Sequence, residues 1–400
     1  MKNDKTLLRP CPICNGKIGE VLHAHKLTLP KEHPLTNEFD VVCCANCGFV
    51  FNDSPSVQQD YDCHYANNSI YESVNLKGLG GTNDSTKFLR IFEQIKPFLS
   101  ENSSIIDVGC AQGGMFNVLK DNGYFRLHGM DLSDVNLNAL QKQGVTPWNN
   151  SICSVSNVSQ KFDFVILSHI LEHVCDLQTS VCNLKKMLPD NGYAYIEVPN
   201  ANKYAEYYPD APFHFFNIEH INHFDLNSLA DLFEPHNLKI VQSFETSMIV
   251  DASVEYPIVG VILQNVNLPV SDYKFSLQSC RDNVKIYIQR CEDDMVRVNQ
   301  LFSDVQKNGN TVVVWGAGNY AQWLMKNSLL AACNIKCFVD KAVAKHHTFV
   351  EGVEVKPVEI LLENELNNER TTIVITAAVY KQQIIDEIKN MNLKCLYFVV

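Results

Sequence analysis

The 400-residue sequence lacks any uninterrupted apolar run near eighteen residues, the length at which a helix can cross a membrane. Its first ten residues, MKNDKTLLRP, lack the apolar core of a secretory signal peptide. Positive charge is also scarce, because 33 Lys and Arg stand against 45 Asp and Glu, which gives a net charge of -12. Such a chain has no overall field that would hold nucleic acid. We therefore expect a soluble cytoplasmic protein that binds neither membranes nor nucleic acid.

Composition sets the size class of the fold. Hydrophobic residues make up 46% of the chain and charged residues 20%, which is ordinary for a globular protein. A chain of this length exceeds what one hydrophobic core usually supports, so we expect two or three domains. Fifteen cysteines in a cytosolic chain indicate free thiols and metal ligands rather than a disulfide framework.

Two C-x-x-C pairs lie near the start of the chain. They are Cys11-Pro-Ile-Cys14 and, about thirty residues later, Cys44-Ala-Asn-Cys47. Four thiolates that converge on one point suit a tetrahedral zinc ion, and a site closed by four cysteines leaves no open position for catalysis. The pattern therefore predicts a structural zinc ion on Cys11, Cys14, Cys44 and Cys47. Cys43 in a shifted register, or buried thiols with coincidental spacing, remain alternatives.

The segment that follows, YDCHYANNSIYES, is rich in tyrosine and polar residues and shows little periodicity. Tyr61, Tyr65 and Tyr71 either lie on a neighbouring domain as part of a surface linker or point into an active site as part of a lid.

A strand, a tight glycine turn and a helix start are predicted at residues 104–116, SIIDVGCAQGGMF. This geometry brings a nucleotide-like ligand to the backbone amides at a helix N-terminus. About twenty-four residues after Asp107, the apolar run LHGMDLS ends on Asp131, whose carboxylate can accept hydrogen bonds from a ribose. The two motifs predict a nucleoside-binding half-sheet.

Strands and helices then alternate along the chain. Strands are predicted at 127–130, near 145, at 162–167 and at 193–198, with helices at about 134–142 and 177–188. Alternation of this kind predicts a doubly wound parallel α/β sheet, whose ligand lies at the carboxyl ends of the strands. Asp107, Asp131 and Ser168-His169 all fall at such ends.

The first glycine turn distinguishes between two cofactor classes. A dinucleotide site favours G-x-G-x-x-G, whereas this chain has D-x-G-x-x-x-G with an acid at the strand end. Together with Asp131 and the fourth strand in FDFVILSHILEHV, this turn resembles those of class I S-adenosylmethionine-dependent methyltransferases. The resemblance implies S-adenosylmethionine as the cofactor, with NAD, FAD or no ligand as the alternatives. The cofactor residues that it implies are Asp107, Gly109, Cys110, Gly113, Asp131 and Ser168.

Histidines and one acid gather in the segment PFHFFNIEHINHFDLNSL, ahead of a helix that Asp225 or Asn227 is expected to cap. The group consists of His214, Glu219, His220 and His223. A histidine beside a carboxylate can act as a general base near neutral pH. A metal site on the three histidines and a purely structural role are the alternatives, and a structural role is also open for His173 in LEHV.

The last third of the chain begins with helical periodicity over residues 276–305 and then repeats the strand–glycine–helix pattern at Gly316-Ala-Gly318. A second strand ends on Asp340, and a third is TTIVITA. Because Ala321 replaces the third glycine, this is a weak dinucleotide motif. Lys341 and Lys345 are either contacts for a diphosphate group of a substrate or exposed, solvated charges.

The order of these motifs resembles that of three-domain sugar C-methyltransferases, which act on nucleotide-linked keto-deoxysugars. The resemblance implies a zinc domain at 1–70, a methyltransferase domain at 71–250, a helical connector at 251–305 and a Rossmann-like domain at 306–400.

The resemblance also implies roles for individual residues in the reaction. It makes His220 the base that removes a proton beside a ketone, Glu219 its orienting acid and His173 a second active-site histidine. Tyr65 or Tyr71, His214 and Asn217 are then expected at the substrate, although the family has tyrosine where this chain has Asn217. Methylation of oxygen or nitrogen, or sugar-nucleotide binding without catalysis, are the alternatives; the oligomeric state is left open.

Overall fold

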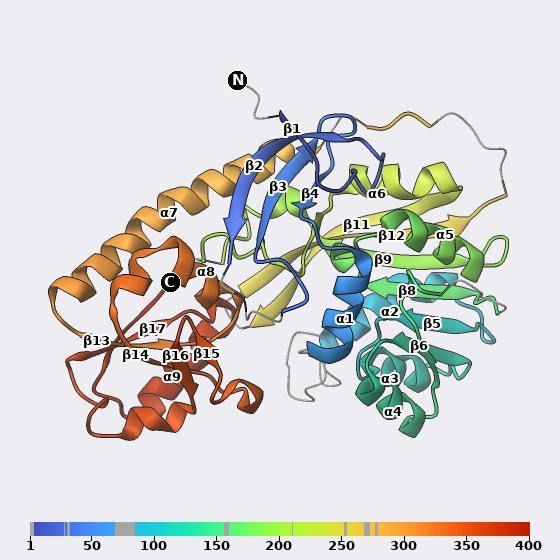
Figure 1. Cartoon of the computed structure of the whole chain (residues 1–400). Helices are drawn as coiled ribbons and strands as arrows, with labels where there is room; N and C mark the ends of the chain where they lie inside the picture. The colour runs from blue at the N-terminus through green and yellow to red at the C-terminus, as the bar shows by residue number, and fades with distance from the viewer. Residues whose placement is uncertain are drawn as a thin grey trace.

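The computed structural model describes residues 4–27, 29, 33–68, 85–155, 160–209, 211–251, 254–267, 273–276 and 279–400. These residues form three β-sheets. In Figure 1 the N-terminal sheet lies at the top, the central sheet at the right and the C-terminal sheet at the lower left. No helix in the described part of the chain combines the length and apolarity that a membrane crossing needs. Tyr71 lies outside the described residues.

The N-terminal sheet is antiparallel and contains one strand from much later in the chain. Its order is β1-β2-β3-β4-β10. The strands are β1 (Asp4–Thr6), β2 (Ile18–Lys26), β3 (Glu38–Cys44), β4 (Val50–Asp53) and β10 (Asn222–His223). Asn222 pairs with Phe51 and His223 with Val50, so this sheet holds the chain directly after His220. Helix α1 (Gln58–Asn68) follows β4 and carries Tyr65.

The central sheet has the predicted doubly wound architecture. Its order is β11-β12-β9-β8-β5-β6-β7, and the five strands from β9 to β7 run parallel. The strands are β5 (Ile105–Val108), β6 (Leu127–Asp131), β7 (Thr146–Asn149), β8 (Phe164–Ser168), β9 (Tyr193–Pro199), β11 (Leu238–Asp251) and β12 (Val254–Asn265). The helices are α2 (Ser85–Ile95), α3 (Gly114–Asp121), α4 (Asp134–Lys142), α5 (Leu177–Met187) and α6 (Leu226–Phe233).

The predicted helical connector at 251–305 requires a correction. Its first part is β12, which pairs antiparallel with both β9 and β11, so the central sheet continues past residue 250. The helical part is one element, α7 (Arg281–Lys307). Figure 1 shows α7 running from the N-terminal sheet to the C-terminal sheet. The helix at 226–233 begins as expected, because Asp225 caps it by accepting a hydrogen bond from the Ser228 amide.

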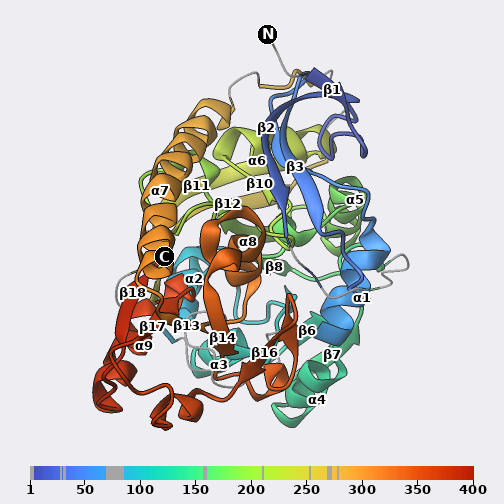
Figure 2. The same ribbon diagram turned by 60° about the vertical axis from the view of Figure 1, so that its left-hand side comes forward.

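The C-terminal sheet has the order β15-β16-β14-β13-β17-β18 and is parallel except at β15. Its strands are β13 (Thr311–Trp315), β14 (Asn334–Val339), β15 (Phe349–Val350), β16 (Val353–Lys356), β17 (Thr371–Ile375) and β18 (Leu396–Val399). Its helices are α8 (Asn319–Asn327) and α9 (Lys381–Asn390). Figure 2 shows α8 next to β2 of the N-terminal sheet, and His25 of β2 stacks on Trp323 of α8.

The two glycine turns are built alike. In the central sheet the Ala111 amide donates to Asp131 over 3.0 Å, and in the C-terminal sheet the Ala317 amide donates to Asp340 over 2.9 Å. Each acid thus ties the turn after one strand to the end of the next strand. The second acid also pairs with Lys345 at 2.9 Å.

Candidate active site

A cavity of about 400 Å³ lies at the carboxyl ends of β5, β6 and β8. Helix α1, residues 214–220 and the C-terminal residues Asn319 and Tyr380 complete its wall. It brings together most of the residues predicted from the sequence: Tyr65, Asp107, Gly109, Cys110, Asp131, Ser168, His173, His214, Asn217, Glu219 and His220. The cofactor motif and the histidine motif therefore share one cavity.

Gly109 lies at the end of β5 and lines the floor of the cavity. Its φ of +68° is in the left-handed region, and a Cβ there would lie 2.1 Å from Cδ1 of Ile170. Glycine is therefore needed for both backbone conformation and space. Gly113 does not line the cavity; it precedes α3 at φ +80°, where a Cβ would lie 2.7 Å from Leu140. Its role is in the turn and in packing.

The cofactor end of the cavity is acidic. The carboxylate of Asp131 accepts from the amides of Ala111 and Ser133 and from the side chain of Asn136. Burial raises the pKa of Asp107 to about 7, against the opposing effect of Lys87. Such a wall fits S-adenosylmethionine, which carries positive charge on its sulfonium and amino groups. The Cys110 thiol donates to the Met130 carbonyl, and burial raises its pKa, so it stays neutral.

The wall of this end also contains residues that were not predicted from the sequence, among them Leu132, Ser151 and Ile152. Leu132 directly follows β6, and Ser151 and Ile152 come shortly after β7. Their position in the sequence could have indicated that they line the cavity, since residues that follow parallel strands meet at one edge of the sheet. Leu132 and Ile152 give this part of the cavity an apolar surface on which the flat base of a nucleoside can pack.

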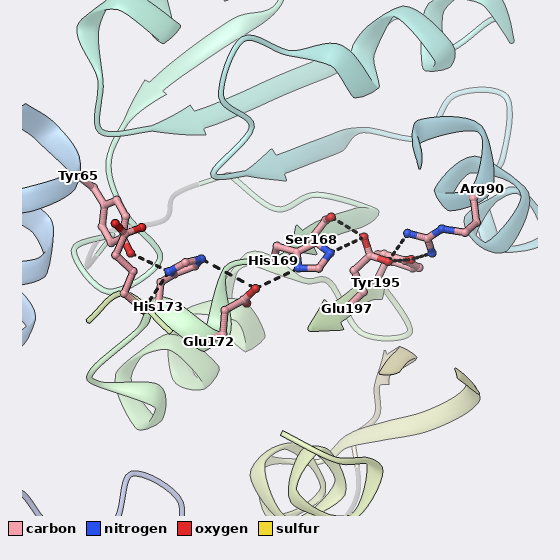
Figure 3. A network of polar contacts seen from close by, with 9 residues as sticks. Tyr65, Arg90, Ser168, His169, Glu172, His173, Tyr195 and Glu197 are labelled. Atoms are coloured by element: carbon pink, nitrogen blue, oxygen red, sulfur yellow. Dashed lines mark hydrogen bonds and ion pairs between the residues drawn. The ribbon is translucent and has the colours of Figure 1, made fainter. Parts of the chain in front are cut away.

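Behind the wall lies a network of polar contacts (Figure 3). Its centre is the fully buried carboxylate of Glu197, which accepts hydrogen bonds from Ser168, Arg90 and Tyr195 at 2.6, 2.7 and 2.8 Å. Burial alone would raise the pKa of Glu197, but His169, Arg90 and Lys87 lower it to about 2. Ser168 is thereby held through its hydroxyl. Glu197 was not among the residues predicted from the sequence.

The network continues toward α1. His169 has a left-handed backbone with φ +57°. Its Nδ1 lies 3.1 Å from Oε1 of Glu172. Oε1 of Glu172 lies 3.9 Å from Nε2 of His173, and Nδ1 of His173 lies 2.7 Å from the Tyr65 hydroxyl and 3.0 Å from the Glu219 carbonyl. Because a carbonyl only accepts, Nδ1 of His173 carries the proton and Nε2 holds the lone pair in the neutral ring.

His220 lies beside His173, with ring centroids 4.8 Å apart. Its Nδ1 is buried and has no hydrogen-bond partner among the described residues. Burial, and then His173, lower the pKa of His220 to about 3, so the ring is neutral near pH 7.

Two neighbours of His220 make contacts that were not predicted from the sequence. The Glu219 carboxylate lies 3.5 Å from Nε2 of His64, a residue of α1. The side-chain oxygen of Asn217 accepts from the amides of Glu219 and His220 at 2.9 and 2.8 Å. Asn217 therefore fixes the turn that presents His220, and its oxygen is engaged there.

The three-histidine metal site is excluded by geometry. Nε2 of His223 faces Asn52 and its Nδ1 faces the Tyr204 hydroxyl, so both nitrogens are engaged. His214 is hydrogen-bonded to the Tyr256 hydroxyl, and burial lowers its pKa to about 4. His214 remains in the cavity wall as a neutral group.

The four predicted metal-binding cysteines also converge. The Sγ atoms of Cys11, Cys14, Cys44 and Cys47 all lie within 4.8 Å of one another. Two pairs are closer: Cys11 and Cys47 at 3.6 Å, and Cys14 and Cys44 at 3.5 Å. Zinc–sulfur bonds of about 2.3 Å place sulfurs about 3.8 Å apart in a tetrahedron, so the cluster fits this ion.

The predicted diphosphate lysines are engaged elsewhere. Lys341 pairs with Glu387 at 2.6 Å and Lys345 with Asp340 at 2.9 Å, and neither lines the cavity. The C-terminal part reaches the cavity through Asn319 at the start of α8 and Tyr380 after β17.

Comparison with protein families matches residues 83–243 to a methyltransferase domain. These residues are a methyltransferase domain. The match spans β5 to β9, the glycine turn and the acidic end of the cavity. The chain is an S-adenosylmethionine-dependent methyltransferase. A search of curated proteins found no match.

Among solved structures, the chain is similar to an S-adenosylmethionine-dependent methyltransferase from Methanosarcina mazei, with 17% identity and a TM-score of 0.39. The alignment covers 44% of this chain and 98% of that one. It is also similar to the N-methyltransferase NodS of Bradyrhizobium japonicum in complex with S-adenosylhomocysteine, with 15% identity and a TM-score of 0.37. That alignment covers 52% of this chain and 98% of NodS.

Proposed function

We propose that this methyltransferase methylates a carbon atom of a nucleotide-linked keto-deoxysugar. The observation that carries the proposal is the neutral ring of His220, whose buried Nδ1 is unpartnered among the described residues and which lines the same cavity as the donor turn. A long acceptor is supported by the extent of the cavity, which runs on to Asn319. Asn319 begins α8, and the free amides of a first helical turn suit a phosphate group.

The proposed reaction proceeds in steps, and residues of this chain are available to assist them. Bound S-adenosylmethionine supplies an electrophilic methyl group beside the Asp107–Asp131 wall. His220 removes the proton from the carbon beside the ketone, and the C–H electron pair forms the enolate. The enolate carbon would accept the methyl group, and the electron pair of the S–CH₃ bond would stay on sulfur. The Tyr65 hydroxyl, held by His173, is positioned to donate to the enolate oxygen.

Hydrogen exchange in deuterated water tests the proposal. With a nucleotide-linked keto-deoxysugar and S-adenosylhomocysteine, which has no methyl group to give, the protein should exchange the proton beside the ketone. His220→Ala should abolish exchange and turnover while S-adenosylmethionine binding stays unchanged. His236→Ala is the matched control, since His236 lies outside the cavity and bonds to Gln178. Normal exchange in His220→Ala would show that another group is the base.

Methylation of oxygen or nitrogen is the second candidate, and Asn217 favours it. Asn217 stands where the resembled family has a tyrosine, so this position lacks the hydroxyl that would donate to a ketone oxygen, and the Asn217 side-chain oxygen accepts two backbone amides instead. A hydroxyl acceptor needs a base but no acidic C–H bond. Methyl transfer to the sugar without prior exchange at carbon would decide for this candidate.

We further propose that the four-cysteine cluster holds a structural zinc ion. The ion would link the loop before β2 to the end of β3 and thereby hold the sheet to which β10 belongs. Its effect on catalysis would be indirect, through the position of the chain that follows His220.

A further inference from the structure

Three potential metal ligands outside the cysteine cluster converge in the cavity. One ligand atom each of Glu172, His173 and His220 lies within 4.8 Å of the others. Glu172 and His173 follow β8 directly, whereas His220 comes from the turn before β10. The set is one carboxylate and two imidazoles in the wall where the acceptor is proposed to bind.

The outer side of two of these groups is held by hydrogen bonds, as is usual around metal ligands. His173 donates through Nδ1 to the Glu219 carbonyl at 3.0 Å, which leaves Nε2 as its ligand atom. Oε1 of Glu172 faces Nδ1 of His169 at 3.1 Å and lies 3.9 Å from Nε2 of His173. Figure 3 shows His169 and His173 on the two sides of Glu172.

Two polar atoms of this set lack hydrogen-bond partners in the described part of the chain. Oε2 of Glu172 and Nδ1 of His220 are buried and have no hydrogen-bond partner among the described residues. Glu172 is only 1% exposed. A buried carboxylate oxygen without a donor is costly, so nearly all such atoms in folded proteins are satisfied. Because one ligand atom each of Glu172, His173 and His220 lies within 4.8 Å of the others, a single cation would satisfy all three groups at once.

The donor set selects the class of ion. Two imidazoles and one carboxylate favour borderline divalent ions such as Ni²⁺, Co²⁺, Fe²⁺ and Zn²⁺, whereas Mg²⁺ and Ca²⁺ prefer oxygen ligands. Bonds of about 2.1 Å require the ligand atoms to lie within about 4.2 Å of one another. Small side-chain rotations from the observed separations satisfy this.

We propose that Glu172, His173 and His220 form a binding site for one borderline divalent metal ion, separate from the cysteine cluster, and that this ion inhibits methyl transfer. Inhibition rests on the proposed function, because an ion on His220 occupies the lone pair that a base needs. The site itself does not depend on that function.

Nickel is a suitable probe, because its X-ray absorption edge distinguishes it from zinc in the cysteine cluster. Calorimetric titration of the full-length, zinc-loaded protein with Ni²⁺ should give one site. Crystals soaked in Ni²⁺ should show its anomalous peak between Glu172, His173 and His220. Glu172→Gln and His220→Gln should each weaken binding by about tenfold or more. His236→Gln is the control and should bind as the wild type does.

The outcomes separate the site from the reaction. An anomalous peak elsewhere, or equal Ni²⁺ affinity in the folded Glu172→Gln and His220→Gln variants, overturns the site and leaves the proposed base untouched. Binding at the three residues without loss of turnover supports the site and overturns inhibition, and it counts against His220 as the base. Inhibition that a chelator reverses supports both parts.

Discussion

The Arg90 guanidinium of α2 donates a 2.7 Å hydrogen bond to the Glu197 carboxylate of β9, which is completely buried. Tyr195 and Ser168 donate to the same carboxylate. A buried carboxylate stays ionised only when charges and donors replace the water that it has lost. The pair thus connects the helix before the donor turn to the strand that supports Ser168.

Arg90→Met should destabilise the fold strongly, because it leaves the Glu197 charge buried without its cation. Breaking one side of a buried pair typically costs about 3–5 kcal/mol. Lys203→Met is the matched control, since Lys203 pairs with Glu206 at the surface and such pairs contribute at most about 1 kcal/mol. Urea unfolding of both variants measures the difference. Equal losses would mean that the other donors suffice for Glu197.

Local patterns predicted much of the central sheet. Alternating apolar runs located β5, β6, β8 and β9, and the acids Asp107 and Asp131 lie at strand ends as expected. Capping of α6 by Asp225 also followed from a local rule, since a short acceptor side chain must meet a first-turn amide.

Pairings between distant segments could not be predicted in the same way. The two-residue strand β10 exists only because Phe51 and Val50 lie beside it. The contact between Glu219 and His64 depends on the placement of α1, which no periodicity reveals. The only sequence feature that could have indicated Glu197 is that it is a single acid inside the apolar strand YAYIEVP. Its partner Arg90 comes from another element.

Gly109→Ala should weaken S-adenosylmethionine binding by at least about tenfold. The new Cβ would meet Ile170 in the cavity wall, and the left-handed backbone adds about 1–2 kcal/mol of strain. Gly144→Ala is the control, because Gly144 has a similar φ of +70° but nothing lies within 4 Å of the new Cβ. Calorimetry should show normal affinity in Gly144→Ala, whose loss of stability should reflect the backbone strain alone. Normal affinity in Gly109→Ala would contradict the placement of the donor.

Donor binding should tighten as the pH rises through about 7. Burial raises the pKa of Asp107 to about 7, so below this pH the Asp107 carboxyl group of the free protein is protonated and neutral. Positive charge on the bound donor favours the ionised form, and binding therefore releases a proton. Calorimetry at about pH 6 and about pH 7.5 should show tighter binding at the higher value. Asp107→Asn should remove most of this dependence, and an unchanged slope would assign the proton to another group.

Cys44→Ser should lower the zinc content well below one ion per chain and destabilise the N-terminal sheet. Cys43 is the natural control, because neighbouring residues of β3 point to opposite faces. Its thiol donates to the Gly48 carbonyl at 3.3 Å, whereas the Cys44 sulfur lies 3.5 Å from that of Cys14. Cys43→Ser should keep the zinc and lose about 1 kcal/mol or less. Elemental analysis and thermal unfolding measure both effects, and zinc lost only from Cys43→Ser would move the site to the shifted register.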